Sequence, residues 1–157
     1  MNLTKKQVKA FLEVISNDDS RPVLCTASVQ MFKDRPYLVA TDSYKLTALL
    51  LDESFKNHVG KVVTRDDLTK WYKLAGTRDV LNPVAVEDML TDASGKYPEW
   101  QALMPEEFGN RETVYFNSKY LLTMETLADK PLKYKFAKDM LYAEDNGNIY
   151  VVMSLRG

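Results

Sequence analysis

The sequence is poor in the residues that build covalent cross-links and metal sites. It contains one cysteine, Cys25, and one histidine, His58. A lone cysteine cannot form a disulfide within the chain, and this pattern is typical of proteins from a reducing compartment. The pair also falls short of the clustered ligands that a structural zinc site needs. We therefore expect no metal and no cofactor.

Catalytic motifs are equally scarce. The chain has no G-x-S-x-G nucleophile elbow, and Gly60-Lys61 lacks the upstream glycine of a phosphate-binding loop. His58 lies in a polar connection, where a surface histidine without a catalytic role is the simpler interpretation. A small hydrolase built around His58 is a remote alternative. The sequence favours a protein that is not an enzyme.

Long apolar stretches are also missing. No run approaches the roughly 20 residues that cross a bilayer, and the N-terminal MNLTKKQVKAF lacks the apolar segment of a signal peptide. We expect a soluble, cytoplasmic protein without membrane contact. The 21 basic and 22 acidic side chains nearly cancel in this 157-residue chain. That balance argues against a uniformly basic coat for nucleic acid, but a local basic face is compatible with it.

Three amphipathic helices are predicted. Thr4, Thr64 and Asn117 are suitable N-caps, and after each of them apolar residues recur at helical spacing. Gly76 is a natural stop for the second helix, and the third is expected over residues 118–128. Cationic side chains lie on the exposed faces of these helices. They are Lys5, Lys6, Lys9, Arg65, Lys70, Lys73 and Lys119.

Such cations have two interpretations. Charged helix faces are usually only solvated, whereas helices that share one surface would let the same cations follow a phosphate backbone without reading its sequence.

The remaining apolar runs indicate strands. The predicted ranges are 22–32, 37–41, 45–51, 61–64, 84–90, 113–116, 132–137, 140–144 and 149–155. Cys25 falls in the first range, where a small buried thiol is expected. Asn146-Gly147 favours a tight type I′ hairpin between the last two strands. A unit of short strand, helix and further strands recurs near residues 1, 59 and 112, which predicts an α+β protein with helices on one face of antiparallel strands.

Several stretches resemble the bacterial sliding clamp, the β subunit of DNA polymerase III. RPVL and YLVATDSYKL (residues 21–46) resemble its ATDGHRLA region, and YPEWQALMP (97–105) resembles its FPDYRRVLP stretch. The terminal YVVMSLRG (150–157) is similar to YVVMPMRL, and FNSKYLLTMETLADK (116–130) is similar to a helix of the last clamp domain. The order of these stretches matches that of the family.

The resemblance implies a DNA-clamp-like fold, with antiparallel sheets outside and helices on the inner face. Residues 1–105 resemble a shortened middle domain of the clamp, and 106–157 resemble the C-terminal half of its last domain. Alternatively, 1–58 and 112–157 form one clamp domain and 59–111 are inserted. Family members close a ring around duplex DNA, so this shorter chain is expected to do so as a homo-oligomer.

The resemblance also implies a cleft for the short clamp-binding peptides of polymerases and clamp loaders. The matching positions are Leu24, Thr41, Ser43, Tyr44, Lys45, Leu46, Pro98, Leu103, Val151 and Met153. A concave apolar surface with an adaptable methionine suits such peptides. Tyr44, in place of the family's histidine, is expected to narrow the entrance. Asp42 is expected to steady the turn by accepting backbone hydrogen bonds.

Two functional hypotheses follow from the resemblance. The first is a non-catalytic processivity factor that encircles double-stranded DNA and holds a polymerase through the cleft. The second is a clamp mimic that occupies clamp-binding peptides without encircling DNA, and so regulates or inhibits replication.

Overall fold

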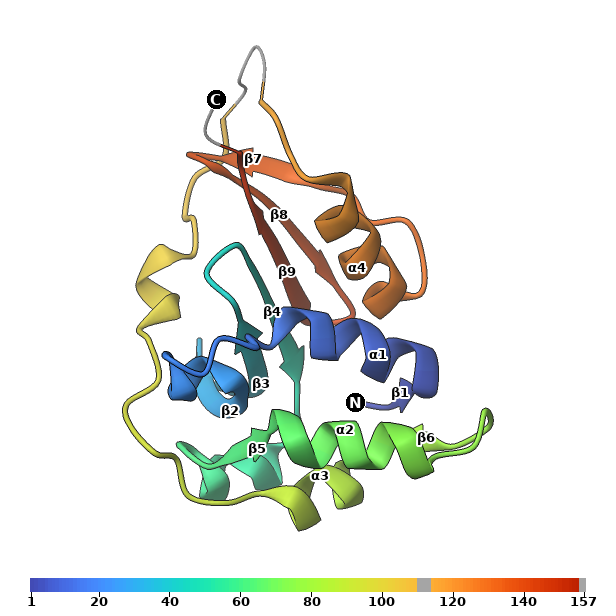
Figure 1. Cartoon of the computed structure of the whole chain (residues 1–157). Coiled ribbons are helices and arrows are strands. Elements are labelled where there is room, and N and C mark those ends of the chain that lie inside the picture. Colours follow the sequence, from blue (N-terminus) through green and yellow to red (C-terminus); the bar gives the residue numbers. More distant parts are fainter. Residues whose placement is uncertain (110–113, 156–157) are drawn as a thin grey trace.

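One antiparallel sheet of seven strands organises the molecule (Figure 1). The computed structural model describes residues 1–109 and 114–155. The strand order is β5-β2-β3-β4-β9-β8-β7. Their bounds are β2 Thr26–Phe32, β3 Arg35–Thr41, β4 Lys45–Leu50, β5 Val62–Thr64, β7 Lys135–Ala137, β8 Met140–Asp145 and β9 Asn148–Met153. A separate two-stranded sheet pairs β1 (Leu3–Thr4) with β6 (Val80–Leu81).

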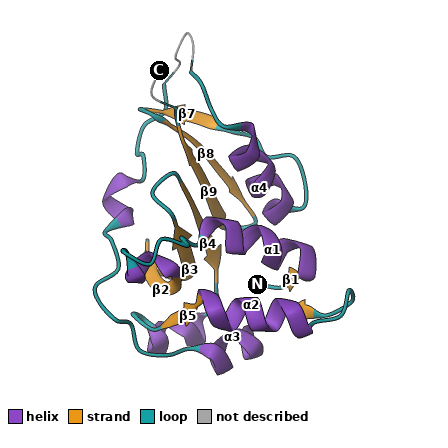
Figure 2. Cartoon of the chain, viewed as in Figure 1, coloured by secondary structure: helices purple, strands orange, loops and turns teal. Residues whose placement is uncertain are grey.

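The longer helices gather on one face of the large sheet (Figure 2). They are α1 (Lys5–Val14), α2 (Arg65–Leu74) and α4 (Ser118–Ala128). The predicted α+β architecture, with antiparallel strands and helices on one face, is therefore confirmed. Among the described residues, no helix is both long and apolar enough to cross a membrane.

The three predicted N-caps are also confirmed. The Thr4 hydroxyl accepts a hydrogen bond from the Gln7 N–H, and the Gln7 side chain accepts one from the Thr4 N–H in return, which makes a capping box. The Thr64 hydroxyl accepts from the Asp67 N–H (3.1 Å), and the Asn117 side chain accepts from the Lys119 N–H (3.0 Å). Each helix therefore begins where the sequence predicts.

Alternation along the strands gives the sheet two cores. In β3, Leu38 points into a core shared with the helices, whereas Tyr37 and Val39 point to the opposite, outer face. The outer core is covered by the segment that follows α3, with Trp100 fully buried there. Both faces of the sheet are therefore buried, and this explains why its central strands are nearly continuous in apolar residues.

The pairing of β4 with β9 joins the first third of the chain to its last strand. Leu46 lies opposite Val151 in this antiparallel ladder, and Ala48 lies opposite Ile149. The ladder continues into the loop, since the Met153 N–H donates to the Tyr44 carbonyl (2.9 Å). Residues about a hundred positions apart in the sequence thus become direct neighbours.

The hairpin predicted at Asn146-Gly147 is confirmed. Both residues have positive φ, at 50° and 82°, as a type I′ turn requires. A Cβ on Gly147 would lie 2.7 Å from Leu50 Cδ2, so glycine is needed here both for its backbone angle and for its small size.

Two strand predictions are wrong. Residues 84–90 form most of a short helix, α3 (Pro83–Met89), because Asn82 caps it through the Ala85 N–H (2.9 Å) and Pro83 occupies its first position. Residues Pro22–Cys25 form a 3₁₀ helix, so the predicted strand begins only at Thr26. Cys25 is consequently half-buried at a helix end and not inside a strand.

Two further strand predictions differ from the structure. Of residues 132–137, only Lys135–Ala137 pair, with β8. In the range 113–116, Val114, Tyr115 and Phe116 belong to no strand, while Thr113 lies outside the described residues, as do Arg156 and Gly157 of the terminal motif. The division of the chain into the predicted domains stays a prediction.

Candidate functional site

One apolar pocket of about 210 Å³ opens on the outer face of the sheet. We call it the outer pocket. Nine of the ten residues predicted for the cleft line it: Leu24, Thr41, Ser43, Lys45, Leu46, Pro98, Leu103, Val151 and Met153. They come from four separate parts of the chain, so only the fold brings them together.

Strand register sets the floor of the outer pocket. Leu46 and Val151 are paired across β4 and β9, and Met140 and Met153 are paired across β8 and β9. Side chains at paired positions point to the same face of a sheet. The floor is therefore apolar and fixed by backbone hydrogen bonds, with two flexible thioethers at one side.

The segment after Tyr97 forms one wall. The Tyr97 hydroxyl donates to the Val39 carbonyl (3.2 Å), and burial raises the pKa of this phenol, which keeps it protonated as a donor. The Gln101 amide donates to the Met31 carbonyl (3.1 Å). Trp100 packs on Phe32 with ring centroids 5.2 Å apart. These contacts hold Pro98 and Leu103 over the sheet.

The turn between β3 and β4 forms the rim. As predicted, Asp42 steadies this turn, because one carboxylate oxygen accepts the N–H groups of Tyr44 and Lys45 at 3.0 Å each. Ser43 has a φ of 79°, and its hydroxyl accepts a hydrogen bond from Arg21 (2.7 Å). The polar residues 41–45, which separate two apolar strands, thus form a hydrogen-bonded turn at the mouth of the pocket.

Lys45 has a structural partner at this rim. Its ammonium lies 2.5 Å from the second Asp42 oxygen and 4.3 Å from the centre of the Tyr120 ring, and the residue is only 6% exposed. A buried ammonium is stable when a carboxylate and an aromatic face replace its water. Lys45 therefore contributes mainly its aliphatic stem to the pocket wall.

Tyr44 is the one predicted cleft residue that does not line the outer pocket. Its side chain is 61% exposed, and its ring lies 6.5 Å from that of Tyr120 on α4. The aromatic contact draws Tyr44 toward the helix side of the turn. In this arrangement it does not narrow the pocket entrance.

Five lining residues were not predicted: Arg21, Glu99, Trp100, Met104 and Met140. The first four lie inside or beside the motifs RPVL and YPEWQALMP, so neighbourhood in the sequence was an available signal. Met140 had no such signal, because its position depends on the register of β8 against β9. Beside Lys45, the outer pocket thus has a second cation, Arg21, and a carboxylate, Glu99, among its lining residues.

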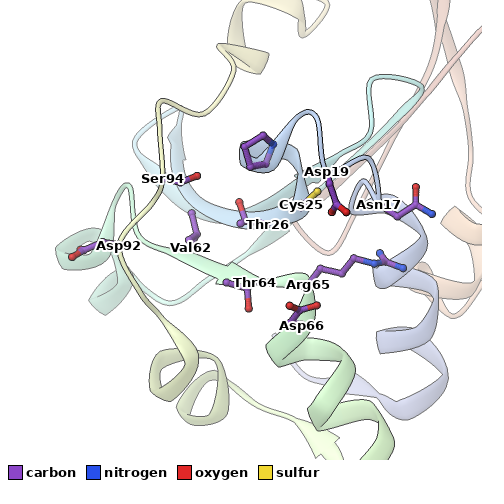
Figure 3. Close-up of a pocket in the computed structure, with 11 residues that line it drawn as sticks. Asn17, Asp19, Cys25, Thr26, Val62, Thr64, Arg65, Asp66, Asp92 and Ser94 are labelled. Carbon is purple, nitrogen blue, oxygen red and sulfur yellow. The ribbon is translucent and has the colours of Figure 1, made fainter.

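A second, polar hollow of about 440 Å³ lies where α2 begins, beside the 3₁₀ helix that ends at Cys25 (Figure 3). Cys25 and Asp66 line it, and burial is the main cause that raises the pKa of the Cys25 thiol, with Asp19 and Asp18 adding to it. A thiol with a raised pKa is a weak nucleophile. Within the described part of the chain, no cluster of three or more potential ligands could hold a metal ion.

The seven cations predicted to face DNA fall into two groups. Lys5 donates to the Ala75 carbonyl (2.8 Å), and Arg65 donates to the carbonyls of Leu12 and Ile15. The other five are exposed on the surface of their helices: Lys6, Lys9, Lys70, Lys73 and Lys119. Two of the seven thus tie helices together, and five are directed to solvent.

His58 lies at the end of a 3₁₀ helix (Glu53–His58), where its Nε2 is 3.1 Å from a Glu87 oxygen. Its ring packs against Phe55 with centroids 5.9 Å apart. These contacts link the 3₁₀ helix to α3, which accounts for this histidine as a structural residue.

The fold is similar to that of solved bacterial sliding clamps. The β subunit of DNA polymerase III from Caulobacter crescentus matches with a TM-score of 0.66 at 16% identity, over 100% of this chain and 65% of that one. The β subunit from Borrelia burgdorferi, solved with a natural product, matches with a TM-score of 0.65 at 11% identity over 99% and 64%. The griselimycin-bound clamp of Bartonella birtlesii matches with a TM-score of 0.62 at 15% identity, over 100% and 66%.

These matches establish the sliding-clamp fold for this chain, and they span about two thirds of the length of the solved clamps. No family model and no curated protein matches the sequence.

Proposed function

We propose that this protein is a non-catalytic, sliding-clamp-like processivity factor that binds clamp-binding peptides in the outer pocket. The observation that carries the proposal is the convergence of nine predicted residues on one apolar hollow. A pocket that is apolar at its floor and polar at its rim suits a short peptide with hydrophobic side chains. The partners would be a DNA polymerase and a clamp loader, in the cytoplasm and without membrane contact.

The test uses a fluorescent peptide that carries the clamp-binding motif of a bacterial replicative polymerase. Leu103 is 64% exposed and lines the pocket, so Leu103→Asp changes the binding surface without opening the core. We expect the peptide affinity, measured by fluorescence anisotropy, to fall by about tenfold or more. Leu74→Asp is the matched control, since Leu74 is 87% exposed on α2 and outside the pocket. Equal affinity in the two variants would contradict the proposal.

Encirclement of duplex DNA by a homo-oligomer is the second part of the proposal. The exposed lysines of α1 and α2 would follow the phosphate backbone without base contacts. Replacement of Lys6, Lys9, Lys70 and Lys73 by Gln should lower the slope of log affinity against log salt by about 0.9 per lysine. Retention on circular DNA and loss from the same DNA after linearisation would demonstrate topological binding.

A clamp mimic that binds peptides without encircling DNA is the second candidate function. It is favoured by the use of Lys5 and Arg65 as helix-to-helix donors, which leaves fewer cations for DNA on a chain of net charge −1. Equal retention on circular and linear DNA, together with intact peptide binding, would support the mimic.

A further inference from the structure

Two strand–helix–strand units of this chain complete each other. The first unit comprises β1, α1 and β2, and the second comprises β5, α2 and β6. The leading strand of the first unit pairs with the closing strand of the second, since Leu3 lies opposite Leu81. The leading strand of the second pairs with the closing strand of the first, where Thr64 lies opposite Thr26. Each strand of one unit therefore has a pairing partner in the other unit.

The helices of these two units repeat the same reciprocity. Lys5, the first residue of α1, donates to the carbonyl of Ala75 at the end of α2 (2.8 Å). Arg65, the first residue of α2, donates to the carbonyl of Ile15 at the end of α1 (2.9 Å). A cation at each helix start thus satisfies carbonyls at the other helix end. The two helices are neighbours that run in opposite directions (Figure 1). The reciprocal strand pairs and helix-end hydrogen bonds relate the two units by an approximate two-fold axis.

A third unit has the same order of elements but no counterpart. It comprises residues 114–116, the Asn117 cap, α4 and β7. Among the described residues, β7 pairs with β8 alone, and residues 114–116 pair with no strand. The unit thus has a leading segment and a closing strand, each without the partner that the first two units provide for one another.

Helix α4 is covered by a neighbouring helix on one flank. It packs against α1, where the Gln7 amide donates to the Leu127 carbonyl and the Thr123 hydroxyl donates to Glu13, both at 2.8 Å. Leu122, which lies away from this contact, is 68% exposed. Tyr115 in the leading segment is 66% exposed, and Phe136 in β7 is 37% exposed. All three elements of the third unit therefore present a large apolar side chain to solvent. Exposed apolar side chains that cluster in this way are typical of protein–protein interfaces.

We propose that the third unit is completed by the third unit of a second copy of this chain, in an isologous two-fold dimer. The first and second units show which partner fits, namely another unit of the same kind in antiparallel orientation. The charges of α4 agree with this, because Lys119 lies in its first turn and Asp129 at its C-cap. Antiparallel pairing places Lys119 against the partner's α4 C-terminus, in the role of Lys5 and Arg65.

Among the described residues, the leading segment and the edge of β7 away from β8 each make one backbone hydrogen bond, which the partner strand would adjoin or replace. The Tyr115 carbonyl accepts from the Leu155 N–H (2.7 Å), and the Phe136 carbonyl accepts from the Gly109 N–H (3.1 Å). The dimer carries two outer pockets, which lie on the face opposite the helices, so peptide binding and dimerisation use different surfaces. The inference rests on the proposed function for its role but not for its test.

Sedimentation equilibrium over a concentration series tests the dimer. We expect a mass of twice the 18.0 kDa of the chain, and a monomer for Leu122→Asp. Circular dichroism and a urea unfolding titration verify that this variant is folded. Val59→Asp is the control, because Val59 is 47% exposed but lies outside the third unit. A wild-type monomer, a dimeric Leu122→Asp chain, or dissociation by Val59→Asp would each overturn the proposal.

A charge exchange tests the orientation. Lys119→Glu and Asp129→Lys should each weaken the dimer by about tenfold, because a two-fold interface contains each altered contact twice. The double variant should return to within about threefold of the wild-type affinity, since the pair is restored with its signs exchanged. Additive loss in the double variant would overturn the antiparallel arrangement. A monomer that still binds the peptide would remove this inference and leave the outer pocket untouched.

Discussion

The outer pocket and the helix face hold their side chains by different means. In the pocket, Leu46 and Val151 are placed by the β4–β9 register, and their short side chains have little freedom beyond it. On the helix face, Lys5 and Arg65 reach across a helix gap on long side chains to bind carbonyls. Backbone register thus determines which side chains line the outer pocket. On the helix face, the carbonyl acceptors nearby determine which cations stay exposed.

This difference matters for function. An apolar pocket fixed by backbone hydrogen bonds can evolve at its rim without loss of its floor. A cationic surface made of flexible side chains is easily diverted to structural use, because any unsatisfied helix carbonyl nearby is an acceptor.

The largest effect is expected at the rim. Asp42→Ala removes the acceptor of two backbone N–H groups and leaves the buried Lys45 ammonium without its carboxylate. The free energy of unfolding should fall by about 3 kcal/mol in a urea titration. Ser43→Gly is the control, since it keeps Asp42 and relieves a positive φ. If both variants lose the same stability, the ion pair does not hold the turn.

A smaller loss is expected between the helices. Arg65→Met keeps the aliphatic stem but removes the donors to the Leu12 and Ile15 carbonyls. We expect destabilisation of about 2 kcal/mol, against less than about 0.5 kcal/mol for the exposed Lys70→Met. The urea midpoints of the two variants measure this contrast. If both variants lose a similar, small amount of stability, Arg65 does not hold the helices together and its charge is available to DNA.

Loss of a single helix cap should cost less again. Thr4→Ala and Thr64→Ala each remove one hydroxyl acceptor, with an expected cost of about 1 kcal/mol apiece. Because the caps lie at opposite ends of an antiparallel helix pair, the double variant should be additive within about 0.5 kcal/mol. Thermal unfolding of the three variants provides the values. Strong coupling would show that the two helices do not form as separate elements.

The smallest effect concerns the polar hollow. Since burial and the nearby Asp19 raise the pKa of Cys25, its alkylation by iodoacetamide at pH 8 should be a few-fold slower than that of a cysteine in a short peptide. Asp19→Asn should recover part of the rate by removing a repelling charge. A rate above that of the peptide would contradict the stated environment of this thiol.

Local signals in the sequence predicted the local features of the fold. Thr4, Thr64 and Asn117 mark helix starts because a side-chain oxygen that accepts from the unpaired N–H groups of the first turn is a short-range requirement. The same reasoning missed α3, where the apolar run 84–90 resembles a strand. Asn82 and Pro83 decide in favour of a helix there, and both signals were readable.

The α+β class was predictable from the sequence, as were the three main helices, the Asn146-Gly147 hairpin and the motifs from which the cleft was predicted, because each depends on neighbours within a few residues. Three other features became visible in the folded chain alone: Met140 lines the outer pocket, Tyr44 turns toward Tyr120, and Lys5 and Arg65 bind helix ends. Those outcomes depend on strand register and on which backbone groups remain unsatisfied after packing, and neither is fixed until distant segments meet.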